Sequence, residues 1–362
     1  MSRIGFYVHH HGRGHLARTR SIVESLNQEA AVLTSIEGVD WDLQIRLPPD
    51  NDPTQNEAAA GVALSSSFHF APICNPRLTQ RMAAIAEWAR EWKPNLLVVD
   101  VSCEIAIVAR LCGLPVVVVR QHGSRGDRAH QLAYESAVAL LAPYTEELED
   151  PTTADWVRER TVYSGGFSRY DGRSMDVAEA RRATNTDPST RQAVVLAGAG
   201  GPGSDLDAVC AAAATTPGWQ WTVIGPTRGT EHGRLRCIGW VDDCWPYICG
   251  ADVVVSGAGD NVVAEVAWAQ RANLVIPEER PFAEQHSKAE ALAQAGLAIV
   301  RWKWPDAVEW PDLLEAAARL STESQRKFVD GAGAARAAAY LEGLAARFSI
   351  PSHEVTLASS TS

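Results

Sequence analysis

The stretch ADVVVSGAGDNVVAEVAWAQRANLVIPEERPFAEQHSKAEAL, residues 251–292, decides the fold. Residues 253–255 are consecutive valines, which is typical of a strand buried on both faces of a sheet. The turn SGAGDN follows, and residues 262–270 have helical spacing. The first turn of such a helix offers free backbone N–H groups to an anion. The pattern therefore predicts a strand, a glycine turn and a helix that together form one side of a ligand site.

The same stretch continues into a second strand and a second helix. Residues 274–276 are apolar and are followed by Pro277, which ends the strand. Glu284 and Gln285 stand immediately before the next helical run. Glu265 lies on the first turn of the preceding helix or just past it. These polar side chains are placed where they could hold a polar ligand.

The remaining chain also alternates strands and helices in two similar halves, which indicates parallel, doubly wound sheets. A length of 362 residues suits two domains better than one. The pair Gly165-Gly166 follows a short strand and precedes a polar stretch, so we place the hinge there. Strands are expected over 4–8, 31–35, 96–100 and 115–120 in the first half, and over 193–196, 221–224 and 235–238 in the second.

Composition excludes several classes of function. The chain is 46% hydrophobic and 21% charged, as in soluble globular proteins, and its formal charge of −11 argues against a nucleic-acid partner. Seven cysteines show no zinc spacing and favour a reducing cytoplasm. The apolar run at the N-terminus is too short for a signal peptide or a spanning helix. A local patch for peripheral membrane contact stays open.

The segment 251–292 resembles the nucleotide-sugar half of the GT-B glycosyltransferases, most closely the family that contains MurG. The resemblance implies that Glu265 holds the ribose and that Glu284 and Gln285 bind the donor sugar. It also implies two Rossmann-like domains, an acceptor domain over 1–165 and a donor domain over 166–332. A helix over 333–350 would cross back to the first domain, and 351–362 would be a flexible tail. Asp260-Asn261 replace the common Gly-Thr or Leu-Thr pair, so the phosphate contacts are less defined than the sugar contacts.

The resemblance extends to other parts of the donor half. GAGGPGS over 198–204 corresponds to the family's Gly-Gly-Ser loop and suits a phosphate-cradling turn. IGWVDD over 238–243 resembles the loop that pairs with the base, and GGFSR over 165–169 resembles the family's Gly-Asn-Pro-Val-Arg. The implied donor-binding residues are Arg169, Gly200, Gly201, Val241, Gly257, Gly259, Asp260, Asn261, Glu265, Glu284 and Gln285.

Polar groups of the first half end its strands and should face the cleft between the domains. The loop GRGH (Gly12, Arg13, Gly14 and His15) sits between a strand and a helix, and the family has a Gly-x-Gly-His loop there. His15 is a candidate base because imidazole titrates near neutral pH. His122 of the RQHG turn and Asp100 are further catalytic candidates. Each could instead have a purely structural role: His15 as a helix cap, His122 as a solvated loop residue, and Asp100 as the end of a buried strand.

No metal or cofactor is expected. No Asp-x-Asp is positioned to hold an ion, and neighbours such as His9 and His10 on a strand would point to opposite faces. The resemblance implies an inverting transfer from a UDP- or dTDP-sugar to an acceptor hydroxyl. The acceptor stays open between a small molecule, a saccharide and a lipid-linked intermediate. Two other functions stay open as well, a UDP-GlcNAc 2-epimerase and a non-catalytic sugar-nucleotide-binding partner.

Overall fold

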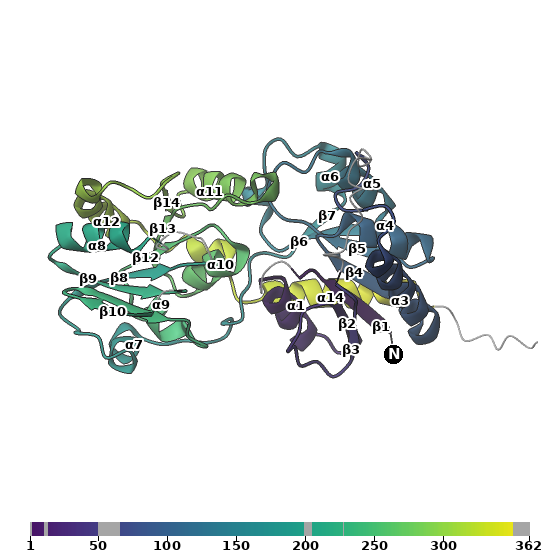
Figure 1. The fold of residues 1–362 in the computed structure, drawn as a ribbon, viewed down its shortest axis with the longest axis horizontal. Helices are drawn as coiled ribbons and strands as arrows, with labels where there is room; N and C mark the ends of the chain where they lie inside the picture. The colour runs from purple at the N-terminus through teal and green to yellow at the C-terminus, as the bar shows by residue number, and fades with distance from the viewer. Residues whose placement is uncertain (1, 11–13, 50–65, 199–204, 227, 350–362) are drawn as a thin grey trace, which may run out of the picture.

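The computed structural model describes residues 2–10, 14–49, 66–198, 205–226 and 228–349. Two α/β domains lie side by side along the long axis of the molecule (Figure 1). Gly12, Arg13, Gly200 and Gly201, which the sequence placed in phosphate loops, lie outside the described residues. No helix within these residues is long and apolar enough to cross a membrane.

The first domain contains a seven-stranded parallel sheet in the order β3-β2-β1-β4-β5-β6-β7. Its central strands are almost wholly apolar because helices cover both faces. The strands are β1 Arg3–Val8, β2 Glu29–Thr34, β3 Gln44–Arg46, β4 Leu96–Asp100, β5 Val116–Val119, β6 Ala139–Ala142 and β7 Thr161–Tyr163. The helices are α1 Gly14–Glu24, α3 Pro76–Trp92, α4 Cys103–Leu111, α5 Arg128–Ser136 and α6 Asp155–Glu159, with a 3₁₀ turn at Glu146–Leu148.

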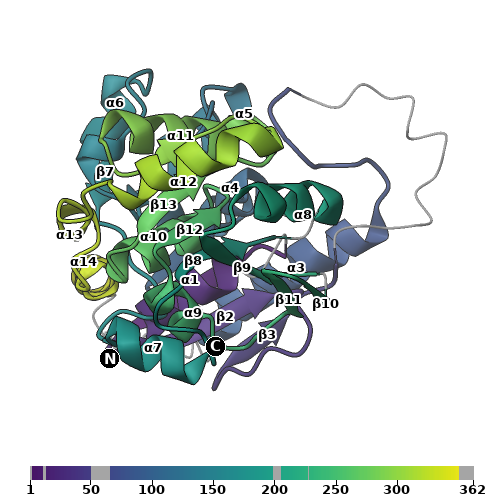
Figure 2. The same cartoon turned by 90° about the vertical axis from the view of Figure 1, so that its left-hand side faces the viewer.

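The second domain also has a seven-stranded sheet, in the order β10-β11-β9-β8-β12-β13-β14. All neighbours pair in parallel except β10, which is antiparallel to β11 at one edge. The strands are β8 Arg191–Leu196, β9 Trp219–Ile224, β10 Arg228–His232, β11 Leu235–Gly239, β12 Val253–Ser256, β13 Ala272–Val275 and β14 Ile299–Val300. Figure 2 shows α8 and α12 on one side of this sheet and α7 and α9 on the other.

The helices of the second half follow the same alternation with the strands. They are α7 Val177–Ala183, α8 Leu206–Thr215, α9 Trp245–Gly250, α10 Asp260–Trp268, α11 Glu284–Gln294, α12 Trp310–Ala318, α13 Gln325–Phe328 and α14 Gly333–Arg347, with 3₁₀ turns at Pro281–Ala283 and Ala307–Glu309. The prediction of two doubly wound sheets is confirmed, with the antiparallel edge strand β10 as the one departure among the described strands.

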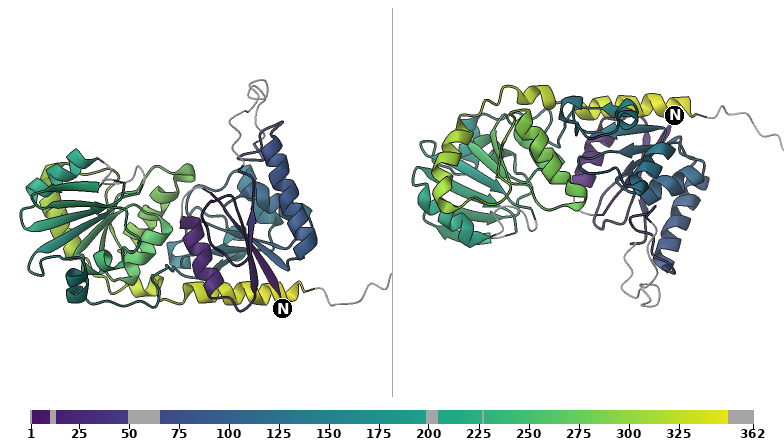
Figure 3. Two further views of the ribbon diagram at one scale, coloured as in Figure 1. Left: turned by 60° about the horizontal axis from the view of Figure 1, so that its bottom comes forward. Right: turned by 90° about the horizontal axis from the view of Figure 1, so that it is seen from above.

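The last helix, α14, belongs to the first domain by its packing. Its buried Ala337 and Leu341 pack in one cluster with Ile4 and Phe6 of β1, and both views in Figure 3 show α14 lying along the first domain. The chain therefore passes between the domains twice.

The two crossings touch each other. Gly166 N–H donates to the carbonyl of Phe328 at 2.8 Å. Gly165 has a φ of +77°, and a Cβ there would lie 2.5 Å from Nη2 of Arg336, so glycine is required. This paired crossing holds the domains at a fixed junction near β7 and the start of α14.

Candidate functional site

A cleft of about 850 Å³ lies between the two domains. The first domain contributes His15, Arg18 and Arg125 to its wall, and the second contributes Asp260 and Glu284. These residues come from the C-terminal ends of strands and the helices that follow, which is where open α/β sheets bind ligands. Of the sequence-predicted residues, this cavity is lined by Gly14, His15, Gly259, Asp260, Asn261 and Glu284, and not by Asp100, His122, Arg169, Val241, Gly257, Glu265 or Gln285.

His15 and Asp100 form a pair at the first-domain wall. Nδ1 of His15, in the first turn of α1, lies 3.2 Å from Oδ1 of Asp100 at the end of β4. Arg18, one turn further along α1, donates to both oxygens of Asp100 at 2.8 and 2.9 Å. Burial alone would raise the pKa of Asp100, but Arg18 and His15 outweigh it and lower that pKa to about 2. Asp100 is therefore ionised at neutral pH.

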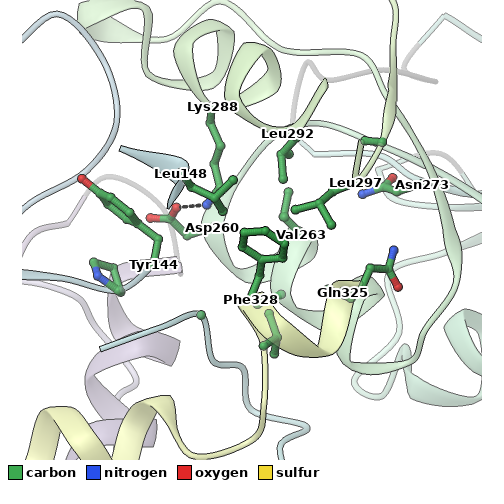
Figure 4. Close-up of a pocket in the computed structure, with 16 residues that line it drawn as sticks. Tyr144, Leu148, Asp260, Val263, Asn273, Lys288, Leu292, Leu297, Gln325 and Phe328 are labelled. Atoms are coloured by element: carbon green, nitrogen blue, oxygen red, sulfur yellow. Dashed lines mark hydrogen bonds and ion pairs between the residues drawn. The ribbon is translucent and has the colours of Figure 1, made fainter. Parts of the chain in front are cut away.

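Arg18 also reaches into the second domain. Its Nη1 donates to Oδ2 of Asp260, the first residue of α10, at 2.7 Å, and Lys288 of α11 donates to the other oxygen of Asp260. Arg18, Asp260 and Lys288 are all nearly buried. Although burial opposes ionisation, Lys288 and Arg18 hold the pKa of Asp260 well below its usual range. Figure 4 shows the Asp260–Lys288 pair beside a smaller cavity of about 30 Å³ at the domain junction.

His122 lies behind the wall of the cleft rather than on it. Its ring is 2% exposed and packs on Tyr144 with ring centroids 4.1 Å apart. Nε2 lies 2.8 Å from the carbonyl of Leu148, and Nδ1 has no hydrogen-bond partner among the residues that the structure describes. Burial and the charge of Lys288 lower the pKa of His122 to about 4, so it is neutral. This placement favours His15 over His122 as a base.

Glu265 lies on the second turn of α10, further from the helix start than the sequence indicated, because α10 begins at Asp260. Its carboxylate is 7% exposed and accepts a hydrogen bond from Nε of Arg169 at 3.1 Å. Burial raises the pKa of Glu265 to about 7, although Arg169 opposes the shift. A buried carboxylate with a half-exposed arginine beside it is suited to accept hydrogen bonds from a ligand.

Glu284 and Gln285 begin α11 but have different surroundings. Glu284 lines the cleft, accepts from Nε2 of Gln121 at 3.3 Å, and lies 3.6 Å from Nη2 of Arg125. Gln285 is buried, and its Oε1 accepts from the backbone N–H groups of Ala258 and Glu278 at 2.8 and 2.9 Å. The oxygen of Gln285 thus ties the turn after β12 to the loop after β13.

The glycines of the turn after β12 have structural reasons of their own. A Cβ on Gly257 would lie 2.9 Å from Oε1 of Gln285, and Gly259 is the N-cap residue of α10. Asn261 donates from Nδ2 to the carbonyl of Gly14 at 3.0 Å, which makes it a contact between the domains.

Val241 is partly buried after β11. Its neighbour Trp240 is 65% exposed.

The histidines after β1 differ from the expectation. The rings of His9 and His10 stack with centroids 4.6 Å apart, so they do not point to opposite faces. The strand ends at Val8, and its alternation of faces ends with it.

One group among the described residues has spacing suited to a metal ion, namely His69, Cys103 and His130. Asp127 binds Nε2 of His69 and Nδ1 of His130, and Arg125 donates to Nε2 of His130. Protein groups therefore occupy both nitrogens of His130, and a guanidinium cation adjoins the group. We assign no metal to it.

Sequence reasoning missed Arg18, Lys288 and Arg125. A helical signal for the first two was present, because Arg18 follows His15 by three residues and Lys288 follows Glu284 by four. Residues at these spacings lie on one helix face, so a catalytic candidate early in a helix marks its neighbours one turn later. Arg125 lies in a loop, where no such periodicity applies.

The comparisons with known proteins agree with this architecture. Residues 229–333 match the model of the glycosyltransferase family 28 C-terminal domain. No protein with curated annotation is significantly similar in sequence.

Three solved structures of low identity share the fold over nearly the whole chain. The spinosyn rhamnosyltransferase SpnG complexed with thymidine diphosphate has 17% identity and a TM-score of 0.62, and covers 96% of this chain and 98% of its own. MurG of Acinetobacter baumannii has 12% identity and a TM-score of 0.61, with 96% and 100% covered. UGT2 of Phytolacca americana, complexed with UDP-2fluoro-glucose and pterostilbene, has 13% identity and a TM-score of 0.66, with 97% and 100% covered. The chain has the GT-B fold, and its residues 229–333 match the glycosyltransferase family 28 C-terminal domain.

Proposed function

We propose that the protein transfers a sugar from a UDP- or dTDP-sugar to an acceptor hydroxyl, with inversion at the anomeric carbon and without a metal ion. The observation that carries this proposal is that His15, which pairs with the buried Asp100, and Glu284 line one cleft from different domains. A base on one wall and a sugar-binding carboxylate on the other are what a direct displacement requires.

The donor half of the proposal rests on the second domain. Glu265 would accept hydrogen bonds from the ribose hydroxyls, and Glu284 from the hydroxyls of the donor sugar. SpnG was solved with thymidine diphosphate and UGT2 with a UDP-sugar, which supports a pyrimidine nucleoside diphosphate as the carrier. The exposed ring of Trp240 is suited to stack on the base.

The chemical step follows from the first-domain pair. Nδ1 of His15 lies 3.2 Å from Oδ1 of Asp100 and 3.0 Å from Nη2 of Arg18. The step uses the tautomer in which Nδ1 carries the proton and donates it to Asp100, because this leaves Nε2 free to take the proton of the acceptor hydroxyl. The acceptor oxygen forms the new bond to the anomeric carbon from the face opposite the nucleotide, and the bond to the diphosphate oxygen breaks with its electron pair. Attack from the opposite face inverts the centre.

The leaving diphosphate gains negative charge in this step. The N-terminus of α10 carries about +0.5 of an elementary charge, and Arg169 adds a full charge near the buried Glu265. Arg18 and Lys288 stand beside the start of the same helix. Because Arg18 and Lys288 already pair with Asp100 and Asp260, the helix N-terminus and Arg169 are the groups that would stabilise the leaving group.

Transfer is favoured over 2-epimerisation by the state of the first-domain carboxylates. Asp100 is occupied by Arg18 and His15, and Glu104 accepts from the backbone N–H groups of His69 and Phe70. Asp100 is engaged through both oxygens and Glu104 through Oε1, which disfavours proton exchange with a sugar carbon. NMR of UDP-GlcNAc incubated without an acceptor should show no epimer, and an epimer would refute the assignment.

The direct test is calorimetry with UDP, dTDP and their sugar conjugates. We expect at least one to bind to the wild-type protein and Glu265→Ala to remove that binding. Complete absence of binding would overturn the proposed function.

The seven cysteines are all free thiols, which supports action in a reducing cytoplasm.

A further inference from the structure

A short segment of the second domain, residues 281–284, docks onto the first domain. The carbonyl of Phe282 accepts a hydrogen bond from the N–H of Ser124 at 2.7 Å. A Cβ on Gly123 would lie 2.4 Å from that carbonyl oxygen, so only glycine allows the approach. Phe282 and Ala283 have φ values of 62° and 53°, in the left-handed region that such residues rarely adopt. A backbone of this kind persists only where its surroundings hold it.

Arg125 of the first domain lies at the centre of this contact. Its Nε donates to the carbonyls of Gln121 and His122 at 3.2 and 3.1 Å, and its guanidinium lies 5.2 Å from the centre of the Phe282 ring. The side chain is only 9% exposed. Arg125 is therefore held rigidly against the docked segment.

The docked segment ends in Glu284, the residue that we place at the donor sugar. Nη2 of Arg125 lies 3.6 Å from Oε2 of Glu284, and Gln121 donates to Oε1. Burial and the neighbouring Asp260 raise the pKa of Glu284, whereas Arg125, Arg18 and His15 lower it. Apart from Asp260, these charged neighbours belong to the first domain. The charge on a donor-domain carboxylate thus depends on acceptor-domain cations.

The opposite side of Arg125 faces a chain of polar groups on the first-domain side of the cleft. Its Nη1 donates to Nε2 of His130 at 3.0 Å, and Nδ1 of His130 donates to Asp127. Asp127 accepts a second hydrogen bond from Nε2 of His69 at 2.8 Å. His69 lines the cleft, so Arg125 connects Glu284 to the wall that an acceptor would meet.

We propose that Arg125 is a positioning residue that holds Glu284 for the donor sugar and joins it to the acceptor wall formed by His130, Asp127 and His69. The proposal rests on the proposed function, in which Glu284 binds the sugar. It implies that the sugar of the donor is recognised only when the two domains are in contact.

The experiment compares the affinity of a nucleoside diphosphate with that of its sugar conjugate by calorimetry. The probes are UDP with UDP-glucose and UDP-GlcNAc, and dTDP with dTDP-glucose. Arg125→Gln and Glu284→Gln should each lower the affinity for the sugar conjugate by about tenfold, which is the effect of one charge-assisted hydrogen bond. Neither change should alter the affinity for the diphosphate. The double variant should be no weaker than either single one, because both changes remove the same contact. Arg191→Gln is the matched control, since Arg191 pairs with Glu315 outside the cleft.

The pH dependence separates positioning from a merely structural role. Loss of the Arg125 charge should raise the pKa of Glu284 further, so sugar binding by Arg125→Gln should require a higher pH than in the wild type. Arg125→Lys should restore the pH dependence but only part of the affinity, because lysine keeps the charge and lacks the planar fork. If circular dichroism shows Arg125→Gln to be unfolded, Gln121→Ala removes the hydrogen bond that Gln121 donates to Glu284 and should weaken binding of the same sugar conjugates.

Three results would overturn the inference. In the first, Arg125→Gln lowers the affinity for the diphosphate and for its sugar conjugate equally. In the second, the losses of affinity in Arg125→Gln and Glu284→Gln add fully in the double variant. In the third, the pH dependence of sugar binding is the same in Arg125→Gln as in the wild type. If the wild type binds no probe at all, the proposed function fails and this inference with it, a result distinct from the other three.

Discussion

Arg18 of the first domain and Asp260 of the second form a buried ion pair, with 2.7 Å between Nη1 and Oδ2. The same guanidinium holds Asp100, the partner of His15, and the same carboxylate holds Lys288. One continuous chain of charges thus runs from the proposed base to the helix at the donor side. Domain contact and the orientation of the base are therefore coupled through two side chains.

The first prediction concerns the stability of this chain. Asp260→Ala should lower the free energy of unfolding by about 3–5 kcal/mol, because it leaves the buried Lys288 without its acidic partner. The double change Asp260→Ala and Lys288→Met should cost less than Asp260→Ala alone. Urea unfolding measures both. If the double variant loses as much free energy of unfolding as Asp260→Ala and Lys288→Met lose together as single variants, the two residues do not interact.

The second prediction concerns the base. His15→Gln should lower kcat by about 10²- to 10⁴-fold, the usual contribution of general base catalysis, and leave the affinity for the donor unchanged. Asp100→Asn should act in the same direction through the orientation of His15. His286→Gln serves as the control, because His286 lies on α11 beside Glu279 and away from the cleft wall. Loss of donor affinity in His15→Gln would contradict the assigned role.

The fold was predictable because its strands are short apolar runs between turn signals. The strand over 96–100 and the valine run at 253–255 were placed almost to the residue. No strand was predicted for β3, which has three residues, for β6, Ala139–Ala142, or for β10, an edge strand whose polar sequence lacks that signal. The helix α10 begins two residues before the predicted start, since Asp260 and Asn261 resemble turn residues.

The site was predictable residue by residue but not contact by contact. His15, Asp100, Asp260 and Glu284 were named from motifs, and all four adjoin one cleft. Their partners depend on how the domains dock, and a single sequence carries no local pattern for that. Gln285 illustrates the limit, because its oxygen serves two backbone N–H groups.

The third prediction follows from the raised pKa of Glu265. Between its unperturbed pKa of 4.5 and the folded value of about 7, the folded protein holds a proton that the unfolded chain has lost. Stability should therefore fall as the pH rises through this window, by at most about 3.4 kcal/mol at 1.36 kcal/mol per pKa unit. Glu265→Gln should flatten the dependence in urea unfolding. An equally steep fall in the variant would assign it to other groups.

The fourth prediction tests the base-binding loop. Trp240 is 65% exposed beside Val241, so its replacement should cost little stability. Trp240→Ala should weaken the binding of UDP or dTDP by about 1–3 kcal/mol if the ring stacks on the base. Trp302→Ala is the matched control, because Trp302 is also exposed and stacks on His286 instead. Equal effects of the two changes would remove Trp240 from the site.

The last prediction concerns α14, whose sequence lies after the second domain and whose contacts lie in the first. Leu341 is fully buried in the cluster that contains Ile4 and Phe6 of β1. Leu341→Ala should destabilise the protein by about 2–5 kcal/mol, the cost of a cavity in a packed core. Because this cavity opens against β1, hydrogen exchange should speed up in β1 and β4 before it does in β12. Faster exchange in β12 alone would mean that α14 stabilises the second domain.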